Sequence, residues 1–333
     1  MMHRSLLILF LCLATICCSA QDPKFSQYFA APLTLNPAFT GFFDGDYRVA
    51  ANTRQQWGNL GDPYNTYSVS GDLKLVEDEN FTNSYFSLGL SGLFDESLNK
   101  ALKSQYISAS VSYYQYMDEG HRFKFGLAPQ VSYVSKYLDY NKLTFASQYN
   151  GDGGFNSAMP NYLDLKNDKT SYFDLNIGAN FAASFDYWSF AVGYAQYHLT
   201  KPQEALLSNS TDIVSARKTV NFGLLYLLNN NIDLNVTGVY NAQKNNRDMI
   251  FGTVLGLKPG DETKMKLNFG MWYKFNEASF YPYVGVAMGN ISAGMNYTVY
   301  GSKLLSATPR TYELSFIYRH NNFRGFKVPC PRF

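Results

Sequence analysis

The stretch Tyr85–Phe94, with the sequence YFSLGLSGLF, alternates apolar and small residues in the two-residue period of a β-strand. One face carries Phe86, Leu88, Leu90, Gly92 and Phe94, and the other includes Ser87, Gly89 and Ser91. The apolar face spans roughly 26 Å along a strand, or about 20 Å along a barrel axis after tilting, near the height of an outer-membrane apolar band. The two phenylalanines would then lie in the aromatic girdles that flank such a band.

The same alternation recurs along most of the chain. It is found at 47–57, 66–73, 107–113, 122–132, 173–181, 188–194, 220–226, 232–240, 249–257, 264–271, 280–288, 291–299 and 312–318. The pattern predicts an all-β fold, a transmembrane antiparallel outer-membrane β-barrel of about 14 strands. An even number of strands would leave both termini on one side, the periplasm. A secreted β-sandwich is the alternative, because its strands also alternate.

The connections support the barrel in part. Tight turns are predicted at 118–121, 184–186 and 229–231, and long connections at 135–170, 198–216 and 300–310. The tight turns and the long connections fall on opposite sides of the predicted barrel, as in outer-membrane barrels. The connection at 276–278 is an exception, because it is short but lies on the side of the long loops. Pro129 and Pro282 lie within predicted strands, and we expect a bulge or strand end at each because proline cannot donate a ladder hydrogen bond.

The chain divides into four predicted parts. Residues 1–20 have the charged start, apolar middle and small-residue end of a secretory signal peptide, whose removal would leave Gln21 first. A pre-barrel or plug segment at 21–45, a barrel at 46–319 and a periplasmic tail at 320–333 follow. After the signal peptide, no apolar run approaches the roughly 18 residues that a transmembrane helix needs.

The composition argues against several functional classes. Aromatic residues make up 17% of the chain and charged residues only 16%, whereas a soluble domain is usually about 25% charged. Removing Arg4 with the signal leaves 27 basic and 26 acidic residues from the original 28 and 26. This balance gives no support to nucleic-acid binding.

Cysteine and histidine are too sparse for a metal site or a catalytic site. Only Cys330 remains after the signal peptide, and His121, His198 and His320 have no metal-ligand spacing. No hydrolase, nucleotide-binding or zinc-protease motif is present. The sequence therefore predicts no enzyme, no metal and no cofactor; a membrane-embedded hydrolase that uses His198 has the least support.

Five stretches of the chain carry a family resemblance: QDPKFSQY at 21–28, LNPAFTG at 35–41, FDLNIG at 173–178, YHLTKP at 197–202 and the closing CPRF at 330–333. With these stretches the chain resembles the PorP/SprF family of Bacteroidota outer-membrane proteins. The signature residues are Ser26, Gln27, Tyr28, Asn36, Pro37, Gly41, His198, Pro202 and Cys330.

This resemblance implies a non-enzymatic part in type IX secretion. Its expected partners are the C-terminal region of one large secreted surface protein, for example a gliding adhesin, other type IX secretion components and outer-membrane lipid. The expected location is the bacterial outer membrane. The alternative function is a passive or ligand-gated outer-membrane channel.

Three segments are candidates for partner binding. Residues 21–43 form either a plug or periplasmic docking strip, or an ordered lead-in packed in the barrel mouth. The loop at 135–170 either recognises a partner or folds into the lumen, and its glycine run at 151–154 has too few carboxylates for calcium. The tail either docks to a periplasmic partner or is solvated. The candidate contact residues are Tyr137, Tyr140, Phe145, Tyr149, Phe155, Tyr162, Phe326, Arg332 and Phe333.

Overall fold

The protein is described by a computed structural model covering residues 22–75, 83–156, 158–160, 168–204, 212–260, 264–301 and 309–320. The predicted signal peptide and its cleavage site, the tail after His320, and Tyr162 lie outside these residues. The candidate residues Phe326, Cys330, Arg332 and Phe333 lie outside them too.

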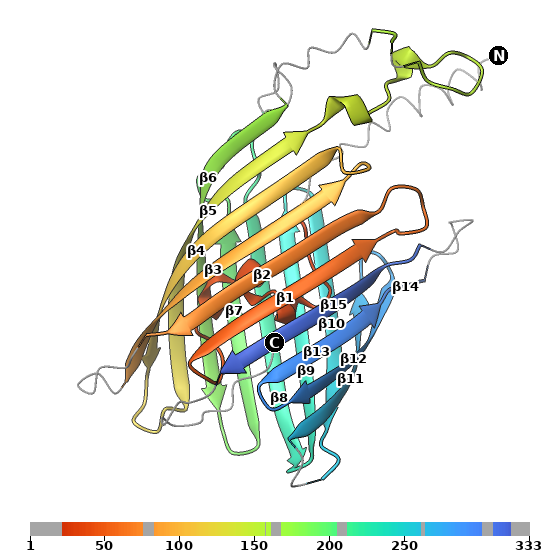
Figure 1. Ribbon diagram of the computed structural model, residues 1–333. Coiled ribbons are helices and arrows are strands. Elements are labelled where there is room, and N and C mark those ends of the chain that lie inside the picture. The colour runs from red at the N-terminus through yellow and green to blue at the C-terminus, as the bar shows by residue number, and fades with distance from the viewer. Residues whose placement is uncertain are drawn as a thin grey trace, which may run out of the picture.

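The strands form one antiparallel sheet that closes on itself (Figure 1). They are β1(Tyr47–Gln56), β2(Tyr64–Lys74), β3(Ser84–Ser97), β4(Leu102–Tyr116), β5(Phe123–Leu138), β6(Lys169–Ser184), β7(Trp188–Tyr197), β8(Arg217–Asn229), β9(Ile232–Gln243), β10(Asn246–Leu257), β11(Met265–Lys274), β12(Ser279–Met288), β13(Ile291–Tyr297), β14(Val299–Tyr300) and β15(Tyr312–His320). Each pairs with its chain neighbours, and β15 pairs with β1 from Tyr47 opposite His320 to Gln55 opposite Tyr312. This last pairing closes the barrel and leaves no free sheet edge among the described strands.

The barrel has 14 strands, as predicted, because β13 and β14 are two parts of one strand. Both pair with β12 in the same register, and the ladder is interrupted opposite Tyr281 and Pro282. The predicted bulge or strand end at Pro282 is wrong, since β12 itself continues. The missing N–H of the proline breaks the partner's ladder instead.

Pro129 also lies within a continuous strand. Pairing of β4 with β5 stops after Ser110 and Gln130, and resumes in the same register at Tyr113 and Leu127. The expected bulge or strand end is therefore wrong here as well. On its other side, Pro129 stays paired with Ile177 of β6.

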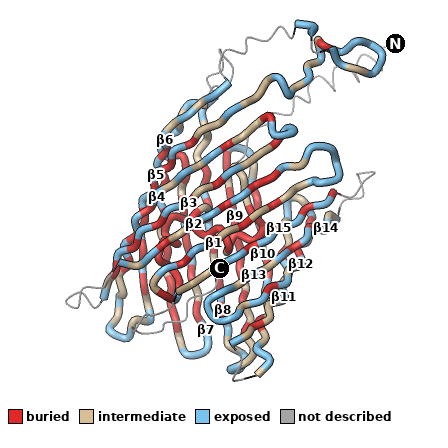
Figure 2. Tube along the Cα trace, viewed as in Figure 1, coloured by how far each residue is buried: buried red, intermediate tan, exposed pale blue. Residues whose placement is uncertain are grey.

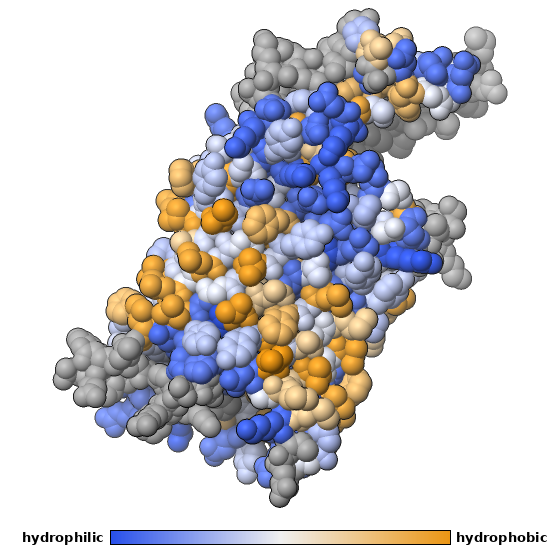
Figure 3. All heavy atoms as spheres, viewed as in Figure 1, coloured by the Kyte–Doolittle hydropathy of each residue, from blue (hydrophilic) through white to orange (hydrophobic). Residues whose placement is uncertain are grey.

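Side chains alternate between the two faces of the sheet. In β3, Leu88 and Leu90 are exposed on the outer face, whereas Ser87 and Ser91 are buried on the inner face. Figure 2 shows this alternation around the barrel, and Figure 3 shows hydrophobic residues over the middle of the strands. The outer surface of the barrel is therefore apolar enough to contact the hydrocarbon of a membrane, and the lumen is lined by polar side chains.

The two ends of the barrel differ. At the base, where β1 begins and β15 ends, the connections include 185–187 and 230–231. The loop end carries the long connections 139–168 and 198–216, but also the short ones 98–101, 244–245 and 275–278. The rule of short turns on one side and long loops on the other thus holds only for the longest connections.

Three short helical turns precede the barrel. They are η1(Tyr28–Ala30), α2(Pro32–Leu35) and η2(Pro37–Phe39), and two further turns, η3(Tyr140–Lys142) and η4(Ala146–Gln148), lie in the connection after β5. Among the described residues, no helix has the length and apolar character needed to cross a membrane.

Candidate functional site

Residues 22–43, which we call the lumen segment, lie inside the barrel and run from its loop end to its base (Figure 1). At the loop end, the Asp22 backbone N–H donates to the Gln243 side chain at the end of β9. At the base, the Gly41 N–H donates 2.8 Å to the Asp72 carboxylate near the end of β2. The segment is largely buried and fills the space that the inward-facing side chains leave.

Asn36 and Pro37 fix the middle of the lumen segment. The Asn36 side chain accepts a hydrogen bond from the Ala38 N–H at 2.9 Å and so caps the turn that Pro37 begins. Its amide N–H also donates 3.2 Å to the Ala179 carbonyl of β6 and 3.2 Å to the Asn221 side chain of β8. One side chain therefore shapes the turn and ties it to two strands.

Glu313 on β15 holds the first part of the lumen segment. Its two carboxylate oxygens accept the backbone N–H groups of Ser26 and Gln27 at 2.7 and 2.8 Å. Arg54 of β1 lies 3.3 Å from the same carboxylate, which is only 1% exposed. Because β1 and β15 close the barrel, this cluster fastens the lumen segment to the closing seam.

Gln27 adds to the same attachment through its side chain. Its amide donates 3.0 Å to the Glu313 carbonyl, and its amide oxygen accepts from the Ser315 hydroxyl at 2.6 Å. The Asn52 side chain of β1 donates to the Gln27 carbonyl. Gln27 thus contacts both strands of the seam.

At the base, Arg48 and Asp72 form a buried ion pair with a separation of 2.8 Å. Arg48 also donates to the Phe39 carbonyl at 2.9 Å, while Asp72 receives the Gly41 N–H. Gly41 has φ +70°, and a Cβ there would overlap the Ser87 hydroxyl. Only glycine fits this turn without displacing β3.

Tyr28 binds the opposite wall of the barrel. Its hydroxyl and the Trp272 indole N–H both reach the Thr237 hydroxyl, at 2.5 and 3.0 Å. The neighbouring Phe29 ring stacks on Trp272 with a centroid separation of 5.6 Å. The lumen segment is therefore fastened to walls on both sides of the lumen.

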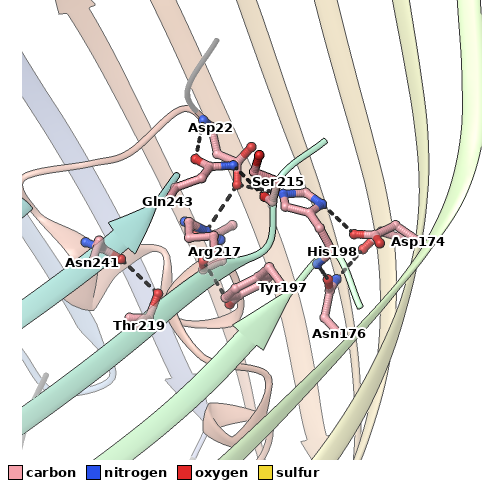
Figure 4. Close-up of polar contacts among 12 residues, drawn as sticks. Asp22, Asp174, Asn176, Tyr197, His198, Ser215, Arg217, Thr219, Asn241 and Gln243 are labelled. Carbon is pink, nitrogen blue, oxygen red and sulfur yellow. Dashed lines mark hydrogen bonds and ion pairs between the residues drawn. The ribbon is translucent and has the colours of Figure 1, made fainter. Parts of the chain in front are cut away.

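An ionic cluster holds the loop end of the lumen segment (Figure 4). His198, directly after β7, lies between two carboxylates, with Nδ1 2.8 Å from Asp174 and Nε2 2.9 Å from Asp22. Arg217 of β8 lies 3.1 Å from Asp22 and stacks over the Tyr197 ring at 3.9 Å. Both partners of the Asp22 carboxylate belong to the barrel wall.

The opposite charges in this cluster stabilise the ionised forms of its members. Burial disfavours the charged form of His198, but Asp22 and Asp174 outweigh it and raise the pKa of His198 to about 9. Burial also disfavours ionised Asp22, yet His198 and Arg217 hold the pKa of Asp22 well below its usual range. The attachment of Asp22 is therefore ionic at neutral pH.

This arrangement is suited to holding the lumen segment in place and not to proton transfer to a substrate. Both ring nitrogens of His198 are engaged by carboxylates, so neither is available to a substrate in this structure. Within the described ranges, no three histidine, cysteine or acidic residues are grouped as a metal site would need.

The predicted partner-binding residues lie elsewhere. Tyr137 belongs to β5, not to the loop, because that strand continues to Leu138; it is exposed on the outer row. Tyr140 lies in η3, and Phe145 immediately precedes η4. Tyr149 and Phe155 pack edge to face at 5.6 Å and are 48% and 52% exposed. The described part of this loop extends beyond the strand ends and does not enter the lumen (Figure 1).

Sequence reasoning missed the wall residues that hold the lumen segment. Glu313, Arg54, Arg48 and Arg217 are charged residues at inward-facing positions of strands. A charged side chain that faces the inside of a barrel needs a partner of opposite charge or a hydrogen-bond partner. Charged residues at inward-facing strand positions were therefore the signal that could have pointed to these attachments. The partner could not be assigned, because Arg48 and Asp72 are 24 residues apart and Ser26 and Glu313 are 287 apart.

The family model for type IX secretion system membrane protein PorP/SprF matches residues 17–318. The chain belongs to this family. It is an outer-membrane β-barrel of the PorP/SprF family, and the predicted resemblance is confirmed. No curated protein matches the chain significantly.

Solved structures similar to this PorP/SprF protein are outer-membrane barrels. The toluene transporter TbuX of Ralstonia pickettii is 11% identical, with a TM-score of 0.51 over 87% of this chain and 93% of its own. The toluene transporter TodX of Pseudomonas putida is 11% identical, with a TM-score of 0.51 and coverages of 90% and 94%. A Pseudomonas aeruginosa FadL homologue is 12% identical, with a TM-score of 0.50 and coverages of 85% and 92%. At these identities the similarity concerns the fold alone.

The PorP/SprF signature residues within the described ranges gather in or around the lumen. Ser26, Gln27, Tyr28, Asn36, Pro37 and Gly41 belong to the lumen segment, and His198 binds its first residue, Asp22. Pro202 lies in the connection after β7, where its carbonyl accepts the Val214 N–H at 2.9 Å.

Proposed function

We propose that this barrel is a non-enzymatic component of the type IX secretion system that binds, helps secrete or anchors a large surface protein. The barrel would hold this partner through the partner's C-terminal region. The barrel would also bind other type IX secretion components and contact outer-membrane lipid. Family membership over residues 17–318 is the observation that carries the proposal. A gliding adhesin is one example of such a partner.

Because the lumen segment occupies the lumen, the structure favours a docking role and argues against a role as a wide channel. The lumen segment is tied to β15 through Glu313, to β6 and β8 through Asn36, and to β2 through Asp72. A folded partner would therefore meet the rims and loops and not the lumen.

We further propose that the loop end faces the cell exterior and the base faces the periplasm. The connections 139–168 and 198–216 support this orientation, because long loops are extracellular in outer-membrane barrels. β15 then ends on the periplasmic side, where the tail would begin. Asp22, however, lies toward the outer mouth, which departs from the expectation that both ends of the mature chain face the periplasm.

The exposed aromatic residues of the loop after β5 are the proposed contact surface. Tyr149 and Phe155 are held near each other by an isolated β-bridge, and Met159 nearby is 40% exposed. Large exposed aromatic side chains supply contact area at a low cost in conformational entropy.

Affinity purification from outer membranes in mild detergent, followed by mass spectrometry, tests the proposal. A single large surface protein should accompany the tagged barrel, and Tyr149→Ser with Phe155→Ser should reduce its yield about tenfold or more. Tyr187→Ser is the matched control, because Tyr187 is an exposed aromatic in a base turn. Deleting residues 321–333 tests the tail separately. Recovery of no large surface protein with the unaltered barrel would contradict the proposal.

A second candidate, a passive or ligand-gated channel, draws support from the fold shared with the TbuX and TodX toluene transporters. Large, stable conductance of the purified barrel in planar bilayers would favour it. The attachments of the lumen segment argue for little conductance in the unaltered protein.

A further inference from the structure

A cavity of about 80 Å³ lies inside the barrel near its base, between the lumen segment and the wall formed by β9–β13 and β15. Its lining includes Asp233, Lys266 and Arg319, which stand one position from the base ends of β9, β11 and β15. The cavity therefore lies just inside the base mouth, away from the ionic cluster around His198.

Three aromatic rings form the inner end of the cavity. Phe29 of the lumen segment stacks on Trp272 at 5.6 Å and meets Tyr283 edge to face at 5.5 Å. Trp272 and Tyr283 are themselves 5.4 Å apart. These rings hold one another in place and present a rigid apolar surface to the cavity.

Small residues on β12 and β13 keep the space open. Tyr283 leans over Gly285 and Gly294, where a Cβ on either glycine would collide with its hydroxyl. Toward the base, β12 and β13 line the cavity with the small residues Ala287, Ser292 and Ala293. The space beside the rings therefore depends on small residues on two adjacent strands.

The base side of the cavity is polar and carries a positive charge. Lys266 donates 2.7 Å to Asp233, which balances one cation with one carboxylate. Arg319 is a second cation at the lining, and Asn268 adds an amide. The titratable lysine, arginine and acidic residues of the lining therefore sum to one positive charge.

We propose that this cavity binds a small organic acid with a flat apolar body. The body packs against Phe29, Trp272 and Tyr283, and the carboxylate points toward Arg319 at the base. About 10–15 Å³ of such space accommodates one water, so 80 Å³ takes a phenyl-sized body with a short chain. The acid is either a free small molecule or the C-terminal aromatic residue of a peptide that enters from the base.

Tryptophan fluorescence tests this directly on the full barrel in a maltoside detergent. Trp57→Phe with Trp188→Phe leaves Trp272 as the reporter, since the sequence has three tryptophans. The probes are 4-phenylbutyrate and its amide, and acetyl-Gly-Gly-Phe and its amide. We expect saturable changes with the acids and about tenfold weaker binding of each amide.

Two substitutions locate the site. Ala287→Leu fills the cavity and should abolish saturation, with Ser292→Val as a second filling variant if the first fails to fold. Arg319→Gln should weaken the acids about tenfold and leave the amides unchanged. Arg122→Gln, at an exposed arginine in a base turn on another wall, is the control and should change nothing.

The outcomes are decisive either way. Tighter binding of the peptide identifies a chain terminus as the source, and tighter binding of phenylbutyrate identifies a free acid. The absence of saturation with both acids, or equal binding in the folded Ala287→Leu variant, would overturn the proposal. Such a site is independent of whether the barrel anchors a surface protein.

Discussion

The lumen segment and the loop after β5 are both irregular stretches, but they are held in opposite ways. Residues 22–43 bind strands on several sides of the barrel through buried side chains such as Glu313 and Asp72. The described loop residues bond mainly within the loop, as in Gln148 to Met159. The loop is joined to the barrel where it leaves β5, since the Asp139 N–H donates to the Ala101 carbonyl at the loop end of the barrel.

This difference separates structural from exposed aromatic residues. Tyr28 lies against Trp272 and Thr237 in the lumen and is buried, whereas Tyr149 is half-exposed in the loop. A substitution in the lumen segment should therefore change the stability of the barrel. A substitution in the loop should change what the barrel binds.

The largest effect should come from Glu313→Ala. The change leaves Arg54 buried without its partner and removes the acceptor of two backbone N–H groups, at a cost of about 3–5 kcal/mol. Urea unfolding in lipid vesicles measures this. Glu96→Ala, which breaks the partly exposed pair with Lys103 at 3.6 Å, should cost less than about 1 kcal/mol. Equal losses would mean that the seam attachment adds no stability.

The next effect should depend on pH. The folded-state pKa of His198, about 9, exceeds its ordinary value of 6.5, so its stabilising contribution is complete below pH 6.5 and is lost as pH rises through 9. The contribution is roughly 3 kcal/mol. Protease resistance of the lumen segment should fall over this range.

His198→Gln should abolish that pH dependence, whereas His121→Gln in a base turn should preserve it. A protein equally resistant at pH 6 and pH 10 would show that the ionic cluster does not hold the lumen segment.

A smaller effect is expected from paired glycine substitutions. Gly41→Ala places an L-residue at φ +70° and overlaps Ser87, costing about 2 kcal/mol. Gly153→Ala in the loop, at φ +84° with open space around it, should cost roughly 1 kcal/mol or less. Comparison of their unfolding midpoints isolates the contribution of close packing. A reversed order would contradict the tight fit at Gly41.

The smallest effect on stability should come from Tyr149→Ser. An exposed loop residue of this kind changes the free energy of unfolding by no more than about 0.5 kcal/mol. Heat-modifiable migration in gels should be unchanged, even where recovery of the surface partner falls. A large loss of stability would place Tyr149 among the structural residues.

The barrel itself could be predicted from the sequence because its signal is local. In Tyr85–Phe94 each residue's face follows from its neighbours, and the observed burial of Ser87 and exposure of Leu88 match that pattern. The role of the aromatic loop residues in partner binding stays a prediction, and β5 is longer than expected and includes Tyr137.

The attachments of the lumen segment could not be predicted because their partners are distant in sequence. The sequence stretch at 21–43 indicated an irregular segment, but its partner Glu313 is at the far end of the chain. His198 looked like an ordinary strand end, since Asp22 and Asp174 become its neighbours only in the closed barrel. The effect of Pro282 was misjudged for a related reason, because the proline changes the ladder on the neighbouring strand.

The course of the lumen segment also constrains assembly. Asp22 lies at one mouth, while β1 starts at the other. The residues around Asp22 must therefore travel the length of the interior before or while β1 and β15 pair. A peptide fused ahead of Asp22 should consequently emerge on the opposite face of the membrane from one fused after His320.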